Sequence, residues 1–453
     1  MRAALAILFA GLASAPLAAN WPQWRGPRGL GVSAESNLPV AWSARENLAW
    51  TAQLRGDGSS SPVVWNDQIL VTSQVGRARV RPGSHPMLAR DDAALAGLER
   101  PIGGRREGAE RSDGTVTLVV ESFNRVDGRR LWEHRLDAEG PFPDLHEKHN
   151  LATPTIATDG ELLFAWFGTG QLVALDLRGR PIWTRHLGRE YSPFDINWGH
   201  GSSPVLYKDL LILLCEHNSA SYLLALDART GTQRWKADRG KGRASFSTPL
   251  VVPGAERDEL IINSSDRIDA YDPGTGELLW YADAPRQTPI PSAVFHQGII
   301  YLTRGYRNSP YLALRPGGRG DVSQSHVLWR APGGGSYVPS LVHYEGLLYL
   351  TNDVGVLTCA EASTGERVWQ MRLDGVFFAS PVAADGKVYF VSQTGETTVV
   401  KAGRTPEILA RNDLGERIVA SPAIAAGQIF LRSDTRLFAI GPAGRPRSPR
   451  SQR

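Results

Sequence analysis

The chain has few cysteines and, after its first residues, no long apolar run. Only two of its 453 residues are cysteine, Cys215 and Cys359, so a disulfide-stapled fold is excluded. No later stretch approaches the roughly 18 apolar residues that a membrane-spanning helix requires. A strong excess of charge is also missing. The formal net charge is +4, and it falls to −1 when five terminal arginines are set aside (Arg2, Arg445, Arg447, Arg450, Arg453). A nearly neutral body argues against a nucleic-acid groove.

The first 19 residues form a separate element. Arg2 is followed by an apolar run and then by small residues ending at Ala19, the pattern of a secretory signal peptide. We therefore expect cleavage near Ala18 or Ala19 and an exported protein, periplasmic or secreted, with no membrane span. No cysteine stands at this junction to carry a lipid. At the other end, residues 442–453 are rich in Arg, Gly, Pro and Ser and are expected to form a basic, disordered tail.

Between these ends the sequence repeats itself eight times. Each repeat opens on a Ser/Thr and Pro pair, continues as an apolar strand, turns at Gly or Asp, and returns as a second apolar strand. The openings are Ser61-Pro62, Thr153-Pro154, Ser203-Pro204, Thr248-Pro249, Pro291-Ser292, Pro339-Ser340, Ser380-Pro381 and Ser421-Pro422. A period of roughly 40–50 residues with β content is typical of propellers. We predict an all-β, eight-bladed β-propeller over residues 20–441, with a long insertion at 76–114.

The repeat unit also carries a turn and a tryptophan. The third repeat reads Ala225 to Gly231 and ends on Trp235, and the fourth copies it from Ala270 to Trp280. Asp can hold the turn through an Asx-type hydrogen bond, and Gly supplies the positive φ of a tight reversal. The Trp then buries its ring against the neighbouring repeat.

The last two repeats break this pattern. In the seventh the equivalent stretch, residues 407–410, has no Trp, and the eighth ends without an outer strand. A strand of the missing type stands at the N-terminus, in residues 47–50. We expect it to complete the last blade and so close the ring, which removes the open edge. Cys215 and Cys359 fall in the third and sixth repeats, too far apart around a ring to form a disulfide, and are expected to be buried.

The motif Ala-x-Asp-x-x-Thr-Gly-x-x-x-Trp at 225–235 and 270–280 resembles the tryptophan-docking motif of PQQ-like propeller repeats. The resemblance covers about residues 47–441. Such proteins include quinoprotein dehydrogenases that hold pyrroloquinoline quinone and calcium, and BamB-type scaffold lipoproteins. The opening Trp21 to Pro27 looks like that of exported propellers without an assigned role. The chain lacks the adjacent cysteines typical of the dehydrogenases and the lipidated cysteine typical of the scaffolds.

Three long connections share one expected face of the propeller: residues 76–114, 137–150 and 188–202. Loops carry function more often than the scaffold does. Two of them end in a histidine before the next strand, so that His149 and His200 would lie side by side near the axis. The ligand-binding candidates are His149, Asn150, Asp195, Trp198, His200 and Arg243. The alternative is that these loop histidines only bond neighbouring backbone.

Three functions remain open. The favoured one is a non-catalytic, monomeric ring that binds envelope or secreted proteins as a scaffold. The alternative is an oxidoreductase with a quinone or metal on the axis, and pyrroloquinoline quinone with calcium is the cofactor it would use. A third is carbohydrate binding through Tyr191, Phe194 and Trp198. The tripeptide Arg319 to Asp321 is expected to be part of a hairpin loop.

Overall fold

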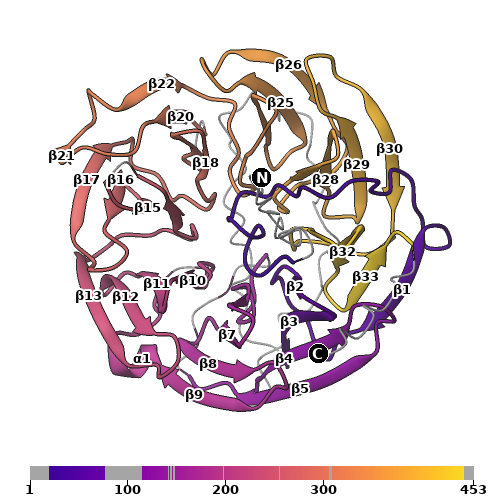
Figure 1. The fold of residues 1–453 in the computed structure, drawn as a ribbon, viewed down its shortest axis with the longest axis horizontal. Helices are drawn as coiled ribbons and strands as arrows, with labels where there is room; N and C mark the ends of the chain where they lie inside the picture. Colours follow the sequence, from indigo (N-terminus) through magenta and orange to yellow (C-terminus); the bar gives the residue numbers. More distant parts are fainter. Residues whose placement is uncertain are drawn as a thin grey trace, which may run out of the picture.

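A computed structural model describes residues 20–76, 115–140, 142, 145, 148–196, 198–254, 256–305 and 309–442. The expected signal peptide, the insertion after Gly76 and the tail after residue 442 lie outside the described residues. Within them the fold is almost wholly β, with one short helix, α1 (Leu187–Glu190). Eight sheets surround a common axis (Figure 1). The prediction of an eight-bladed β-propeller is confirmed.

Each blade is an antiparallel sheet whose strands run from the axis outward. Blade 1 has β2 (Val63–Trp65), β3 (Gln68–Val75), β4 (Thr117–Asn124) and β5 (Arg130–Asp137). Blade 2 has β6 (Ala157–Thr158), β7 (Leu162–Trp166), β8 (Gln171–Asp176) and β9 (Pro181–His186). Blade 3 has β10 (Val205–Tyr207), β11 (Leu210–Glu216), β12 (Ser221–Asp227) and β13 (Gln233–Gly240). Blade 4 has β14 (Leu250–Val252), β15 (Glu259–Asn263), β16 (Arg267–Tyr271) and β17 (Leu278–Asp283).

The second half of the ring repeats this order. Blade 5 has β18 (Val294–His296), β19 (Ile299–Thr303), β20 (Tyr311–Leu314) and β22 (Val327–Ala331). Blade 6 has β23 (Val342–Tyr344), β24 (Leu347–Thr351), β25 (Val356–Glu361) and β26 (Arg367–Arg372). Blade 7 has β27 (Val382–Ala384), β28 (Lys387–Val391), β29 (Glu396–Lys401) and β30 (Ile408–Asp413). Blade 8 has β31 (Ala423–Ala425), β32 (Gln428–Arg432), β33 (Arg436–Ile440) and, from the other end of the chain, β1 (Leu48–Gln53).

The burial of the strands follows from their place in the blade. In blade 3 every residue of β11 is buried, because neighbouring blades cover both of its faces. The outer strand β13 is mostly exposed at the rim and buries only Trp235 and Arg239. Continuous apolar runs therefore mark the middle strands of each blade. Cys215 and Cys359 are both fully buried free thiols in such strands.

Tryptophans fasten one blade to the next. Trp183 of blade 2 donates from Nε1 to the Ala228 carbonyl of blade 3, at 3.0 Å. Its ring lies on Gly231, where a Cβ would come within 2.7 Å of it, and this glycine has φ +71°. Position 231 therefore requires glycine for two reasons: the positive φ, and the space that the indole ring fills. The same glycine contact is made by four further pairs: Trp50 with Gly128, Trp132 with Gly179, Trp235 with Gly276, and Trp329 with Gly365.

The joint between blades 4 and 5 is built differently. Trp280 donates to the Glu259 carboxylate at 2.9 Å, and the Gly317 amide donates to the same oxygen at 3.2 Å. The following residues form β21 (Gly320–Asp321), a fifth strand that pairs in parallel with β17. The Arg-Gly-Asp tripeptide is therefore not part of a simple hairpin loop, since two of its residues extend the neighbouring blade.

The N-terminal strand closes the ring. β1 pairs with β33, with Trp50 opposite Ala439, and Trp50 donates to the Arg125 carbonyl of blade 1 at 2.9 Å. The prediction that residues near 47–50 complete the last blade is confirmed. The missing tryptophan of blade 7 is replaced from the same segment. Buried Trp42 belongs to the core cluster against which Ala410 packs, and its amide donates to the Asn412 side chain of β30 at 2.8 Å. Its ring lies 6.3 Å from that of Tyr389, close to the 6.1 Å between Trp369 and Tyr349 in blade 6.

Before β1 the chain crosses one face of the propeller (Figure 1). We call residues 20–46 the N-terminal segment. Trp21 forms an antiparallel bridge with Val64 in blade 1, and Val32 forms a parallel bridge with Ala383 in blade 7. Glu35 accepts hydrogen bonds from the amides of Ala426 and Gly427 in blade 8. The segment therefore covers the innermost strands on this face and carries Trp24 across the axis.

Candidate functional site

A belt of hydroxyl side chains surrounds the axis. The backbone amide of one blade's belt residue donates to the hydroxyl of the next: Ser61 to Thr155, Thr155 to Ser203, Ser203 to Thr248, Thr248 to Ser292, Ser292 to Ser340, Ser340 to Ser380, and Ser380 to Ser421, at 2.8–3.2 Å. These are the repeat openings seen in the sequence, with one change of register. In blade 2 the belt residue is Thr155, after Pro154, and not Thr153. The hydroxyl of Ser61 is buried without a partner.

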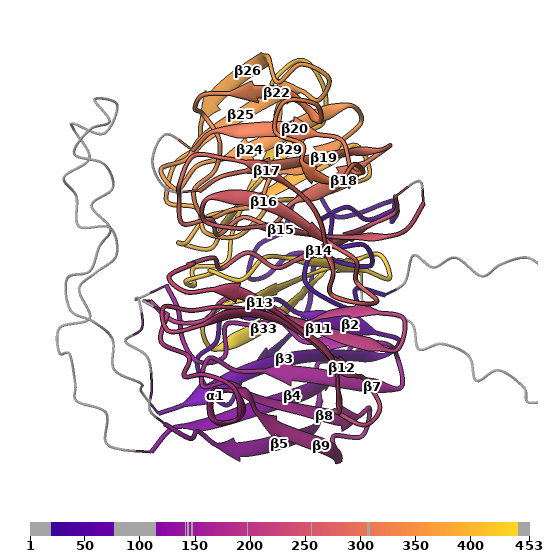
Figure 2. The same ribbon diagram turned by 90° about the vertical axis from the view of Figure 1, so that its left-hand side faces the viewer.

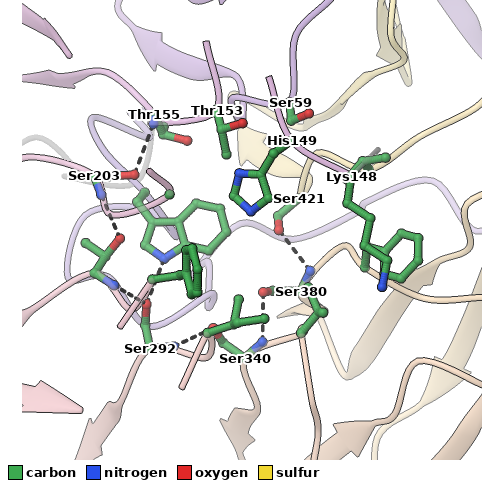
Figure 3. Close-up of a pocket in the computed structure, with 18 of the residues that line it drawn as sticks. Ser59, Lys148, His149, Thr153, Thr155, Ser203, Ser292, Ser340, Ser380 and Ser421 are labelled. Atoms are coloured by element: carbon green, nitrogen blue, oxygen red, sulfur yellow. Dashed lines mark hydrogen bonds between the residues drawn. The ribbon is translucent and has the colours of Figure 1, made fainter. Parts of the chain in front are cut away.

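The belt encloses an axial cavity of about 280 Å³ (Figure 3). Its wall follows the repeat, because every blade contributes the residue two positions before its belt residue. Those residues are Ser59, Thr153, Gly201, Phe246, Ile290, Val338, Phe378 and Val419. Trp24 of the N-terminal segment also lines the cavity, and its Nε1 donates to the Ser292 hydroxyl at 3.1 Å.

The connection between β5 and β6 brings Lys148 and His149 to this cavity (Figure 3). Lys148 reaches across the axis to blade 6, where its ammonium lies 3.5 Å from the Asp353 carboxylate. The same ammonium lies 3.9 Å from the centre of the Phe378 ring. Burial raises the pKa of Asp353, while Lys148 and the Val338 amide oppose that shift. This ion pair thus connects the loop that enters blade 2 with blade 6, on the opposite side of the ring.

His149 is held in its neutral form. Its ring lies 5.8 Å from that of Phe246, and its Nδ1 is buried without a hydrogen-bond partner. Desolvation, with a smaller contribution from Lys148, lowers the pKa of His149 to about 4. A neutral imidazole can donate from one nitrogen and accept at the other. Nδ1 of His149 is therefore a buried, unpaired ring nitrogen with almost no accessible surface.

His200 does not line the cavity with His149, contrary to the expected shared pocket. It is buried with its ring 4.1 Å from Trp166 and 5.2 Å from Phe194. Its Nε2 lies 3.1 Å from the Ser202 carbonyl and its Nδ1 3.4 Å from Nε2 of His217. Burial lowers the pKa of both histidines, that of His217 to about 4. The preceding Gly199 has a φ of +92°, a backbone conformation that favours glycine.

The other candidate residues are dispersed. Trp198 lines the cavity, with its Nε1 buried and unpartnered and its backbone at φ +74°. Asn150 stays in its own loop, where its side chain accepts from the Ala152 amide at 2.9 Å. Asp195 accepts from the Ser219 amide, and Arg243 pairs with Asp266 at 2.8 Å. Neither of these two lines the cavity.

Three buried arginines stand behind the cavity wall without a carboxylate in contact. Arg25 follows Trp24 and donates to the Leu341 carbonyl at 2.7 Å. Arg432 donates to the carbonyl of Ser60, next to Ser59. Arg304 donates to Asn263, whose amide in turn donates to the Pro291 carbonyl beside Ile290. Burial lowers the pKa of Arg25 to about 9 and those of Arg304 and Arg432 to about 10. All three remain cations at neutral pH.

The cavity does not fit a quinone held through calcium. Calcium takes six to eight oxygen ligands, with carboxylates prominent among them, and among the described residues that line this cavity there is neither Asp nor Glu. Among the described residues, no group of three or more His, Cys, Asp or Glu side chains converges to hold a metal ion. The described part of the chain also has no helix long and apolar enough to cross a membrane.

The sequence pointed to His149 and Trp198 but missed Lys148, Phe246, Tyr337, Phe378 and Trp24. A signal for two of them was present. The residue two positions before each belt residue lines the cavity, so alignment of the eight openings identifies Phe246 and Phe378 directly. Lys148, Trp24 and the partner Asp353 come from loops or from distant segments, and their positions depend on the closed ring.

The chain matches the model of one protein family, described as outer membrane protein assembly factor BamB, over residues 114–308 and 319–404. A curated relative, tetrathionate hydrolase of Acidithiobacillus ferrooxidans, is 24% identical over 299 residues, or 60% of this chain. The chain spans 53% of that relative's length.

Two solved structures share the fold. BamB from Moraxella catarrhalis superposes with a TM-score of 0.56 at 14% identity, over 86% of this chain and 98% of that one. Quinohemoprotein alcohol dehydrogenase from Comamonas testosteroni superposes with a TM-score of 0.63 at 13% identity, over 97% and 83%. At these identities the similarity concerns the fold alone.

Proposed function

This chain belongs to the family described as outer membrane protein assembly factor BamB, and from that premise we propose that it is an exported, non-catalytic propeller that binds another envelope protein as a scaffold. A rigid ring that exposes loops on one face suits this role, because loops positioned by a scaffold are common binding elements. The proposed location is the periplasm or the exterior of the cell.

The difference between the two faces of the ring supports this proposal. The N-terminal segment covers one face, while α1 and the β9–β10 connection lie on the other (Figure 2). We call this second side the loop face. Its β5–β6 and β9–β10 connections are joined by an ion pair between Glu139 and Arg189. Among the described residues the N-terminal segment covers only the opposite face, so the loop face is the side proposed to bind a partner.

Catalysis by a bound quinone is the less favoured function. The described residues that line the axial cavity include no carboxylate to hold calcium, and the chain lacks adjacent cysteines. The relative named tetrathionate hydrolase offers a second comparison, but this chain spans only 53% of its length. Hydrolysis of tetrathionate is therefore not proposed here.

Site-specific photo-crosslinking in cells tests the scaffold function. A photo-reactive residue replaces Arg189 on the loop face, where its side chain is 63% exposed. The matched control replaces Arg229, which is 70% exposed in the β12–β13 turn on the side of the N-terminal segment. We expect a discrete, competable adduct with an envelope protein from position 189 and none from 229. Equal labelling from both positions, or no adduct from 189, would contradict the proposal.

A further inference from the structure

A second pocket, separate from the scaffold function, lies between the N-terminal segment and the innermost strands of blades 3, 4 and 5. Residues 23–30 form one wall, and β10, β14 and β18 contribute to the other, around a volume of about 270 Å³. The backbone of the segment bonds with Val64, Thr158 and Ala383, in blades 1, 2 and 7. Among the described residues it makes no such bond with blades 3–5, so a space remains there. We call this space the segment pocket.

The wall of the segment pocket is mostly aliphatic. Prolines, leucines and valines supply most of its lining, together with the ring of Phe295. Leu30, Leu206, Val251 and Phe295 are only partly buried, so apolar area remains accessible in the pocket. An apolar cavity of about 150 Å³ is large enough for benzene. A pocket of about 270 Å³ therefore has room for an aliphatic chain of several carbons, whose burial would remove apolar area from water.

One unpaired charge stands in this apolar lining. Among the described residues that line the segment pocket, only Arg28 is charged. Its side chain is exposed, and within the described part of the chain it makes no ion pair and no hydrogen bond. A planar guanidinium matches the two oxygens of a carboxylate. Arg28 is therefore available to an anionic group that enters the pocket.

Two histidines next to Arg28 show that no acidic group compensates its charge. The rings of His296 and His343 are stacked, with their centres 4.0 Å apart, and His296 is exposed directly after Phe295 in β18. Burial and the charge of Arg28 lower the pKa of His296, and burial and His296 lower the pKa of His343 to about 4. No acidic side chain among the described residues opposes either shift. This corner of the pocket therefore favours a negative charge.

We propose that the segment pocket binds a medium-chain aliphatic carboxylate: the chain lies among Leu30, Leu206, Val251 and Phe295, and the carboxylate accepts from Arg28. An anion without a chain would leave the apolar wall in water, and an alkylammonium would meet the like charge of Arg28. The site lies on the side of the N-terminal segment, opposite the loop face, so it is independent of the protein partner proposed there. Residues 23–30 form one wall, so the site exists only when the segment is in place.

Calorimetry with the full mature chain tests this site with acetate, hexanoate, octanoate, 1-octanol and octylammonium. Complete burial of one methylene strengthens binding about fourfold, so we expect a gain of about two- to fourfold for each methylene between hexanoate and octanoate. We expect 1-octanol to bind about threefold more weakly than octanoate, since an exposed ion pair contributes modestly, and octylammonium more weakly still. Acetate should not bind detectably.

Three results would overturn the proposal. The first is the absence of octanoate binding, and the second is octylammonium that binds as tightly as octanoate. The third is binding to phosphatidylglycerol vesicles without binding to free octanoate, which would assign the pocket to a membrane surface.

Two variants separate the contributions of the charge and of the apolar wall. Arg28→Gln should weaken hexanoate and octanoate by the same factor, about threefold, and leave 1-octanol unchanged. Phe295→Ala should instead reduce the gain for each methylene. The matched control is Arg178→Gln, because Arg178 is exposed and lies outside the pocket, and it should change neither. Thermal unfolding shows whether each variant is folded. A folded Arg28→Gln protein with full affinity for octanoate would refute the assigned contact, whereas the crosslinking result at position 189 would be unaffected.

Discussion

Most joints between blades are built by the repeats, whereas the two joints beside blade 8 depend on the N-terminal end of the chain. Within the repeats, as between blades 2 and 3, one stretch of sequence supplies the tryptophan, the glycine it covers and the belt hydroxyl. The joints on either side of blade 8 are finished by the N-terminal segment and β1 instead. Trp42 replaces the indole that blade 7 lacks, and Trp50 fastens blade 8 to blade 1. No belt bond links Ser421 to Ser61, and there Arg432 donates to Ser60.

This difference shows how the ring and its cavity depend on one another. The N-terminal segment completes the two irregular joints and also places Trp24 on the axis. Ring closure and the floor of the cavity are therefore parts of one structure. Four experiments compare the two kinds of joint, ordered by the size of the expected effect.

Removal of residues 20–54 should have the largest effect. Blade 8 would lose its outer strand, blade 7 its substitute indole and the cavity its floor. The exposed edge of β33 would then be free to pair with other chains. We expect aggregation or a large fall in Tm, measured by calorimetry and size-exclusion chromatography. An unchanged melting curve would show that the joints within the repeats are enough to keep the ring folded.

Replacement of a single tryptophan by alanine should have the next largest effect on stability. Trp183→Ala, at a joint within the repeats, and Trp42→Ala, at the joint finished by the N-terminal segment, should each lower the free energy of unfolding by about 3 kcal/mol. Adding Ala410→Trp to Trp42→Ala should restore part of the loss, because it returns an indole to the outer strand of blade 7. Adding the same substitution to Trp183→Ala should restore nothing. Chemical denaturation measures all four proteins.

The joint between blades 2 and 3 should also respond to pH. The pKa of buried His217 is lowered to about 4 by desolvation, against the opposing effect of Asp195, and that of its neighbour His200 is also lowered. Between pH 6.5 and 4, His217 is protonated in the unfolded chain but stays neutral in the folded chain. Stability is therefore complete above pH 6.5 and is lost as the pH falls through 4, by up to about 3 kcal/mol for His217.

The control for this pH effect is the variant His217→Phe, which should have a flatter slope of stability between pH 6.5 and 4. At the joint between blades 8 and 1, Arg432 keeps its charge throughout this range, because its pKa is about 10. An unchanged slope in the variant, read from denaturation midpoints at each pH, would assign the pH effect to other groups.

Belt hydroxyls should give the smallest but most specific difference. Ser292 accepts from the Thr248 amide and from Trp24, so Ser292→Ala leaves two donors without partners and should cost about 1–3 kcal/mol. The hydroxyl of Ser61, at the closing joint, accepts nothing. Ser61→Ala should therefore change stability by less than about 0.5 kcal/mol. Equal losses in the two variants would mean that the belt is bonded at all joints.

Much of the fold could be predicted from the repeated residues. The openings, the Asp and Gly of the turns and the recurring Trp gave the blade count, and the missing outer strand gave the closure. The candidate site was predicted less well. His149 and His200 end similar connections, yet one lines the cavity and the other pairs with His217 in the core. Lys148 contacts Asp353, 205 residues away in sequence, which no local pattern could show.

The sequence by itself determined the number of blades, the fastening of most joints and the ring of residues that lines the axis, because these depend on local spacing repeated in every blade. The tertiary structure alone decided which polar groups were left without partners and where buried charge gathers. Trp24, Trp42, Arg25 and Lys148 acquire their roles only when the ring closes and brings distant segments together. Burial and pairing depend on those long-range contacts, and the sequence pattern of a single repeat does not contain them.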